Sequence, residues 1–344
     1  MAYTTINKSS DYFNTKLYTG TGSSNAQTGV GFQPDWTWIK NRTTAGEGHH
    51  SYDSVRGVTK RLRTDTNAAE STVSTGLTTF GTDGFTVGSN DGCNKNGIGI
   101  ASWNWKANGA GSANTDGSIN TTATSASTTS GFSIVKYTGG GTSATIGHGL
   151  GVAPKVIMIK CTDSTDKWIV YHNSIGNTKY LVLNDTDAET TDSAHFNNTS
   201  PTNSVFSVGT SGATSGNGQH FIAYCFAEKT GYSKFGSYVG NDVADGTFVY
   251  CGFKPAFVML KKSSQTSDWL ICDSKRNTSN VVNKKLFPNT NGTEDSYDVS
   301  DFVSNGFKIR TTSGAINASG QTYIYMAFAE APLVGTNNVP CTAR

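Results

Sequence analysis

The residues best placed for ionic chemistry are two carboxylate and guanidinium pairs at one spacing, Asp53 with Arg56 and Asp273 with Arg276. An aspartate three residues before an arginine can accept charge-assisted hydrogen bonds from the guanidinium and clamp one turn of the chain. The corresponding segment between them, residues 172–175, reads His-Asn-Ser-Ile and lacks the ion pair. Since one copy does without the pair, we interpret these four residues as turn scaffolding rather than as a reactive site.

Three glutamates, Glu70, Glu189 and Glu294, each follow a leucine by eight residues. Thr186 stands three residues before Glu189, which is the spacing of a capping box, and asparagines stand at the same position before the other two. We expect each segment to be a strand that runs into a short helical turn held by its own cap. The alternative is that the carboxylate and its Asx neighbours hold a glycan or a cation.

No catalytic or metal-binding motif accompanies these residues. The six histidines are scattered, and the sequence has no HExxH, no GxSxG elbow and no P-loop. Residues 90–97 are rich in oxygen ligands but hold a single carboxylate, so an ordinary polar turn is favoured over a calcium loop. The six cysteines have no CxxC pairing, which favours reduced thiols in a core. We therefore expect a protein that is not an enzyme and needs no cofactor and no metal.

The elements that must position these side chains are repeated. Pro34 is followed by apolar residues two, four and five positions later and by a lysine at the sixth, and the same holds for Pro154 and Pro255. Proline lacks a ladder donor and sits at the start of a strand, and the apolar run behind it suits a buried strand. Other aromatic markers and the three glutamates recur in the same order, so the sequence predicts three copies of one β unit.

The spacing of the copies sets the expected domain boundaries. Residues 1–107 form a first β-sandwich repeat with an N-terminal arm, residues 131–230 a second and residues 231–332 a third. Gly, Ser and Thr dominate residues 108–130, which we expect to be a linker or an extended strap across a partner surface. Residues 333–344 form a C-terminal tail.

The tryptophans come in pairs two residues apart, Trp36 with Trp38 and Trp103 with Trp105, so each pair points to one face of a strand. Exposed pairs would form a platform for sugars, but the other two copies hold different apolar residues at these positions, so we expect packing in a core. The opposite face of the proline-led strand is also apolar in the later copies, which requires cover on both sides. That cover is either an extra layer in each sandwich or a neighbouring domain or subunit.

Composition excludes some partners. The formal net charge is +2, from 27 basic and 25 acidic residues, which gives no field that attracts polyanions and argues against nucleic acid as a partner. No segment approaches the roughly 20 apolar residues of a membrane span, and the first ten residues have no secretory apolar core. We expect a soluble protein made in a cytoplasm. The basic run at residues 60–63 is interpreted as a solvated strand edge, with a contact surface as the alternative.

Several segments resemble an uncharacterised repeat family found in virion-associated proteins of tailed bacteriophages, many of them marine. The resemblance covers nearly the whole chain and rests on Ala2-Tyr3-Thr4-Thr5-Ile6 followed by Tyr12-Phe13, on residues 34–40, 52–57 and 83–88, and on the closing Pro340-Cys341-Thr342-Ala343-Arg344. It implies an all-β structural or adhesion module of three tandem β-sandwich domains, akin to jelly-roll or concanavalin-like folds. It supplies no catalytic residues.

We therefore expect a non-catalytic virion structural protein made in the host cytoplasm, namely a tail-fibre or tail-associated component that mediates host-surface attachment. Its expected partners are other virion proteins, further copies of itself in a homo-oligomer such as a trimer, and host-surface glycans, without nucleic acid or membrane insertion. One alternative is a protein that decorates or cements the capsid. Another is a glycan-degrading enzyme on a lectin-like scaffold, in which neutralising one of the three glutamates would abolish turnover.

Overall fold

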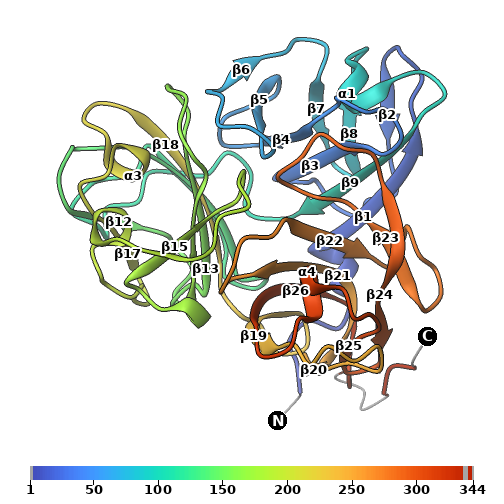
Figure 1. The fold of residues 1–344 in the computed structure, drawn as a ribbon. Coiled ribbons are helices and arrows are strands. Elements are labelled where there is room, and N and C mark those ends of the chain that lie inside the picture. Colours follow the sequence, from blue (N-terminus) through green and yellow to red (C-terminus); the bar gives the residue numbers. More distant parts are fainter. Residues whose placement is uncertain (1–2, 336–339, 343–344) are drawn as a thin grey trace.

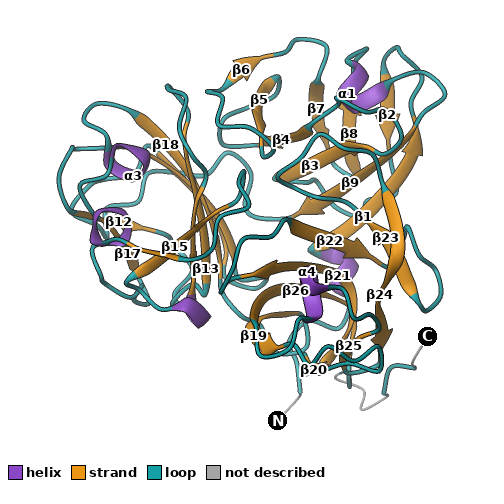
Figure 2. Cartoon of the chain, in the orientation of Figure 1, coloured by secondary structure: helices purple, strands orange, loops and turns teal. Residues whose placement is uncertain are grey.

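The structure is a computed structural model that describes residues 3–335 and 340–342, and its chain is all-β, as predicted. The named strands form antiparallel sheets, and the helices of the described chain are single turns of three or four residues (Figure 2). Three lobes, coloured blue to teal, green to yellow and orange to red, surround a common centre (Figure 1). The described parts of the predicted N-terminal arm and C-terminal tail lie at the third lobe.

The first lobe, residues 8–107 and called the first unit, contains a six-stranded and a three-stranded sheet. The large sheet has the order β1 (Phe13–Thr19), β9 (Gly99–Trp105), β3 (Trp36–Asn41), β4 (His49–Asp53), β5 (Lys60–Arg63) and β6 (Ser71–Thr72). The small sheet has the order β2 (Asn25–Gln27), β8 (Gly84–Val87) and β7 (Leu77–Gly81), and the helical turns are η1 (Ser9–Asp11) and α1 (Asp91–Asn94).

The second unit, residues 108–230, has a seven-stranded and a two-stranded sheet. The large sheet has the order β10 (Ala123–Ser127), β11 (Phe132–Thr138), β18 (His220–Phe226), β13 (Val156–Cys161), β14 (Ile169–His172), β15 (Lys179–Val182) and β16 (Thr190–Thr191). The small sheet pairs β12 (Ala144–Gly147) with β17 (Val205–Val208), and the helical turns are η2 (Asn173–Ile175), α2 (Ser193–Phe196) and α3 (Gly212–Ser215).

The third unit, residues 231–332, has two four-stranded sheets and the turn α4 (Gly314–Asn317). One sheet has the order β19 (Ser233–Val239), β26 (Thr322–Pro332), β21 (Phe253–Lys262) and β22 (Trp269–Asp273). The other has the order β20 (Phe248–Tyr250), β25 (Gly306–Ile309), β24 (Asp295–Val303) and β23 (Val282–Lys285). The order β1-β9-β3-β4 in the first unit is the same as β11-β18-β13-β14 in the second and β19-β26-β21-β22 in the third.

The three large sheets turn one face toward a shared core. The ring of Trp36 stacks 4.4 Å from Trp105 of its own unit and 4.5 Å from Tyr224 of the second, and Phe13 stacks 5.2 Å from Phe328 of the third. Trp36, Trp38, Trp103 and Trp105 are at most 1% exposed, so the prediction that they pack in a core is confirmed. This core is shared by all three units and is not confined to one of them.

The opposite face of each large sheet packs on the small sheet of its own unit. Ile39 of β3 joins a separate apolar cluster with Phe85 and Val87 of β8. The equivalent clusters join β13 to Phe206 in the second unit and β21 to Phe307 in the third. Of the two kinds of cover expected for the two-faced strands, the structure has the neighbouring domain, because each large sheet packs on its own small sheet on one side and on the other units on the other side.

The units meet head to tail, and the contacts return from the third unit to the first. Each of the three glutamates donates its backbone N–H to a carbonyl two residues after the repeated lysine of the next unit: Glu70 to Thr162 (2.9 Å), Glu189 to Ser263 (2.8 Å) and Glu294 to Arg42 (2.6 Å). In return, three carbonyls accept from the next unit: Asn67 from Asp166, Thr186 from Ser267 and Asn291 from Gly46. Because the same heterologous contact is made three times and closes, the chain forms a ring.

The repeated lysines hold the loops that make these contacts. Lys40, Lys160 and Lys261 are at most 1% exposed, and the Nζ atom of each donates to two backbone carbonyls, among them Glu47, Ser164 and Ser267 in the loops that follow. Burial lowers the pKa of each ammonium group to about 8, against the attraction of nearby acidic groups. The lysine that ends the repeated pattern is thus part of the junction between units.

Two expectations about these segments are wrong. No helical turn forms at residues 67–70, 186–189 or 291–294, because the glutamate N–H groups donate to the neighbouring unit instead of to a local cap. Residues 108–130 are not a free linker, because β10 pairs along β11 and Ile119 bridges to Ile146. The expected strap does cover a surface, but that surface belongs to the same chain.

Candidate functional site

The predicted ion pairs lie at the junctions between units. Arg56 Nε donates to Asp53 Oδ2 at 2.5 Å, and Arg276 Nε donates to Asp273 Oδ2 at the same distance. These four side chains are at most 1% exposed. Each aspartate also accepts from a ring of the neighbouring unit, since Tyr224 donates its hydroxyl to Asp53 at 2.7 Å and Trp103 donates its indole N–H to Asp273 at 3.1 Å. Both pairs are therefore buried structural ion pairs, or internal struts, and neither offers an uncompensated charge to a ligand.

At the remaining junction a neutral histidine replaces the ion pair. His172 Nδ1 accepts from the N–H of Ser174 at 3.2 Å, so Nε2 carries the proton and donates to the Tyr325 carbonyl of the third unit at 3.2 Å. Burial lowers the pKa of His172 to about 4, although the hydrogen bond to Tyr325 opposes this shift. A second proton would have to sit on Nδ1, where the N–H of Ser174 already points.

This geometry predicts an acid-sensitive junction. The folded pKa lies below the unfolded value of about 6.5, so the unfolded chain binds a proton first, and His172 costs stability as the pH falls from about 6.5 to 4. The expected loss is about 3 kcal/mol in the free energy of unfolding, measured by urea titrations across this range. His172→Asn can still accept from Ser174 but does not titrate, so its loss over the same range should be smaller by that amount. Identical pH profiles for the two proteins would contradict this role, and the buried His49 and His50 give both proteins a common background.

The three glutamates have different surroundings. Glu294 receives two hydrogen bonds from the Arg42 guanidinium of the first unit, at 2.9 and 2.7 Å, and a third from Arg276 at 3.2 Å. Although burial opposes it, these contacts lower the pKa of Glu294 below its usual value. Glu189 pairs with Lys179 at 2.5 Å. Glu70 is held by Arg56 at 3.2 Å and approached by Lys60 at 3.9 Å, without a cation from the second unit.

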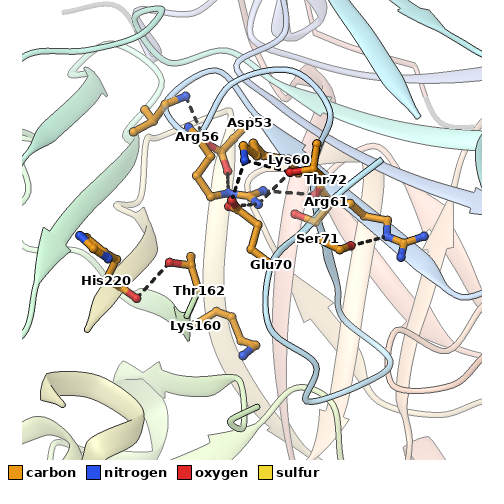
Figure 3. Close-up of polar contacts among 12 residues, drawn as sticks. Asp53, Arg56, Lys60, Arg61, Glu70, Ser71, Thr72, Lys160, Thr162 and His220 are labelled. Atoms are coloured by element: carbon orange, nitrogen blue, oxygen red, sulfur yellow. Dashed lines mark hydrogen bonds and ion pairs between the residues drawn. The ribbon is translucent and has the colours of Figure 1, made fainter. Parts of the chain in front are cut away.

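A pocket lies beside Glu70, at a junction where the second unit supplies a small side chain. Thr162 of the second unit occupies the position that Arg42 occupies at the junction between the third and first units, as their hydrogen bonds to the glutamate N–H groups show. Threonine leaves the space that the arginine fills. The result is a pocket of about 210 Å³ lined by Arg56, Lys60, Glu70, Lys136, Thr162, Asp163 and His220, most of which Figure 3 shows. We call it the junction pocket.

The far wall of the junction pocket is built by the second unit. The backbone N–H and the ring Nδ1 of His220 both donate to Asp163 Oδ2 at 2.8 Å. Thr162 donates its hydroxyl to the His220 carbonyl at 3.1 Å (Figure 3). Although partial burial opposes it, these bonds from His220 hold the pKa of Asp163 below its usual value. Asp163 is therefore a fixed carboxylate in the wall that the second unit supplies, whereas Glu70 belongs to the first unit.

The near wall comes from the β5–β6 hairpin of the first unit. Lys60 donates to Thr72 at 2.9 Å, and on the other side of the hairpin Arg61 donates to Ser71 at 3.2 Å (Figure 3). A second pocket of about 210 Å³, which contains Arg61 and Arg63, lies on that other side. The basic run expected to be a solvated edge thus forms part of the walls of two pockets.

The lining of the junction pocket contains both donors and acceptors, which suits a ligand rich in hydroxyl groups. Glu70 and Asp163 accept, whereas Lys60 and Lys136 donate. Its volume is below the roughly 300–1,000 Å³ of pockets for drug-sized ligands, so it fits a group the size of one sugar ring. No group of three or more metal-ligating side chains occurs in the described part of the chain.

Of the residues singled out in the sequence, Arg56 and Glu70 line the junction pocket, and Asp53 holds Arg56 from behind. Asp273, Arg276, Glu189 and Glu294 lie at the other two junctions. Sequence reasoning missed Lys136, Thr162, Asp163 and His220. The sequence signal that could have indicated the pocket is the residue two positions after each repeated lysine. It is an arginine in the first copy and a threonine or serine in the others.

The fold defines an all-β protein of the β-sandwich class. Residues 8–332 match the family model described as "Domain of unknown function (DUF7483)", which spans most of the sequence, and the chain belongs to that family. No curated protein matches the chain. Among the described residues, no helix has the length and apolar character needed to cross a membrane.

Proposed function

We propose that this chain is a non-catalytic virion structural protein of a tailed phage, a tail-fibre or tail-associated component that attaches to glycans of the host surface. The motifs described above support the virion assignment, since they resemble those of virion-associated proteins. The junction pocket supports the attachment role, since its polar lining suits sugar hydroxyls and the shared core holds its two walls at a fixed separation.

The observation that carries the proposal is the difference between the junctions. Arg42 fills the junction between the third and first units with an ion pair, whereas Thr162 leaves the corresponding space open beside Glu70. The glutamates also suit binding better than catalysis. Glu70, Glu189 and Glu294 are each paired with a basic side chain. Although burial opposes it, the contacts with Arg42 and Arg276 lower the pKa of Glu294, whereas a glycosidase acid requires a raised pKa.

Thr162→Arg tests the proposal by restoring the missing side chain. Its guanidinium should pair with Glu70 as Arg42 pairs with Glu294, fill the junction pocket and weaken glycan binding by about tenfold or more. Binding of the purified chain to an array of bacterial surface polysaccharides measures this, with Thr162→Ser as the matched control that keeps both the hydroxyl and the pocket. Undiminished binding by a folded Thr162→Arg protein would contradict a role for the pocket.

A double exchange, Arg42→Thr with Thr162→Arg, moves the opening to the junction between the third and first units. There the residues in register with Lys136 and His220 are Leu17 and Gly99. We expect no glycan binding from this variant, because an open gap alone lacks the charged wall. Binding at the wild-type level would show that the ligand contacts lie elsewhere.

Capsid decoration is the second candidate, and one feature favours it. β10 is the outermost strand of the seven-stranded sheet and belongs to the polar segment 108–130. Ser112 of this segment pairs with the outer edge of β10 at Thr124, so the surface offered to a neighbouring subunit in a lattice is the polar segment itself. Copy number per virion separates the two candidates, since a few to a few tens of copies indicates the tail and hundreds indicate the head.

Self-association is part of the proposal, and the outer edge of the third unit suits it best. β20 is an edge strand on which Phe248 and Tyr250 are 46% and 53% exposed, with Val239 and Val243 close by in the sequence and also exposed. In the described chain these four are most of the large exposed apolar side chains. Because the three units already close on one another, contacts with further copies have to use such an outer surface.

A further inference from the structure

The junction pocket has a cation that nothing in the described protein neutralises. Arg56 is matched by the buried Asp53, Lys60 stands beside Glu70, and His220 is bonded to Asp163. Lys136, which projects from β11, has no ion pair or side-chain hydrogen bond among the described residues. The pocket therefore presents two carboxylate acceptors and one unmatched ammonium group.

Comparison with the other two junctions shows that this cation is specific to the pocket. Strand register places Lys136 opposite Ile222, and the corresponding positions are Leu17 opposite Ala101 in the first unit and Ser237 opposite Ile324 in the third. The same registers align His220 with Gly99 and Thr322. Two junctions lack the arginine, because Thr162 and Ser263 stand at its position. Of these two, only the junction with Thr162 has a lysine and a histidine at the aligned positions, so the two basic residues occur together with the junction pocket.

We infer that the junction pocket takes a sugar that bears a carboxylate, as in a hexuronic acid residue of an acidic polysaccharide. The ligand carboxylate pairs with Lys136, and ring hydroxyls donate to Glu70 and Asp163. This inference rests on the proposed attachment function and specifies its ligand. A dianion such as phosphate fits less well, because two fixed carboxylates in the pocket walls repel a second negative charge.

Isothermal titration of the full chain with glucuronate, glucose and inorganic phosphate, at low salt, tests the ligand class. Wild type should bind glucuronate about tenfold more tightly than glucose, which is the effect expected of one charge-assisted hydrogen bond, and should bind phosphate more weakly than glucuronate. Lys136→Gln should lose that preference and keep its affinity for glucose. Lys8→Gln, which removes an equal charge from the exposed Lys8–Asp11 pair, should leave all three affinities unchanged.

The outcomes separate this inference from the proposed function. Equal affinities of wild type for glucose and glucuronate would overturn the acidic-sugar inference and leave glycan attachment standing. Failure of wild type to bind either sugar, with no binding to the polysaccharide array, would overturn both. Tighter binding of phosphate than of glucuronate, or a glucuronate preference that persists in Lys136→Gln, would also overturn the assignment of the ligand carboxylate to Lys136.

Discussion

Asp53→Ala is expected to lower the free energy of unfolding by about 3–5 kcal/mol, because it leaves the buried Arg56 guanidinium without its counter-ion. Asp53 accepts from the backbone N–H groups of Val55 and Arg56, from Arg56 Nε and from the Tyr224 hydroxyl of the second unit. The substitution therefore removes a turn clamp and a contact between units together. Urea unfolding followed by circular dichroism measures the loss.

Asp11→Ala provides the control for this experiment. Lys8 and Asp11 have the same spacing and a 2.7 Å separation, but their side chains are 69% and 46% exposed. An exposed pair contributes at most about 1 kcal/mol, so this variant should stay close to wild type. Equal and small losses for the two aspartates would contradict the role of Asp53 as an internal strut.

Trp36→Ala should cost about 3–5 kcal/mol and destabilise all three units together. Its ring stacks on Trp38 and Trp105 of the first unit and on Phe132 and Tyr224 of the second, and its indole N–H donates to Ser51 at 2.8 Å. Because this ring belongs to the shared core, the cavity left by its removal weakens the packing between units as well as within the first.

Differential scanning calorimetry distinguishes one core shared by the three units from a separate core in each unit. Wild type and Trp36→Ala should each unfold in one transition, and the midpoint should fall in the variant. Val58→Ala, at a site where the side chain is 38% exposed, should leave the midpoint nearly unchanged. A variant with two transitions, one of them at the wild-type temperature, would mean that the other units fold independently of Trp36.

Local sequence patterns predicted the strands and the buried rings well. The Pro-led pattern marks β3, β13 and β21, since the large apolar residues that follow the proline suit a strand with neighbours on both sides. The prediction that the proline starts the strand is wrong for β21, where Pro255 lies inside the strand at a register shift that accommodates its missing N–H. The spacing of Asp53 and Arg56 likewise predicted their ion pair correctly, because the two residues lie in one turn. Such features depend on residues within a few positions of one another.

Features that depend on contact between units could not be predicted in this way. The capping spacing at Thr186 and Glu189 is a local signal, but the N–H of Glu189 donates to Ser263 of the third unit. β10 was hidden because Ser, Thr and Ala, which dominate it, are also typical of linkers. The junction pocket depends on the absence of a side chain at Thr162, and that absence has meaning only once Arg42 is seen to fill the same place beside Glu294.

Binding stoichiometry tests the central claim most directly, namely that three head-to-tail β units form a ring with one junction open to a ligand. Titration of the chain with an acidic oligosaccharide selected from the array should give one site per chain in wild type and none in Thr162→Arg, with equal melting temperatures. Two or three sites per chain, or one site that persists in Thr162→Arg, would contradict it.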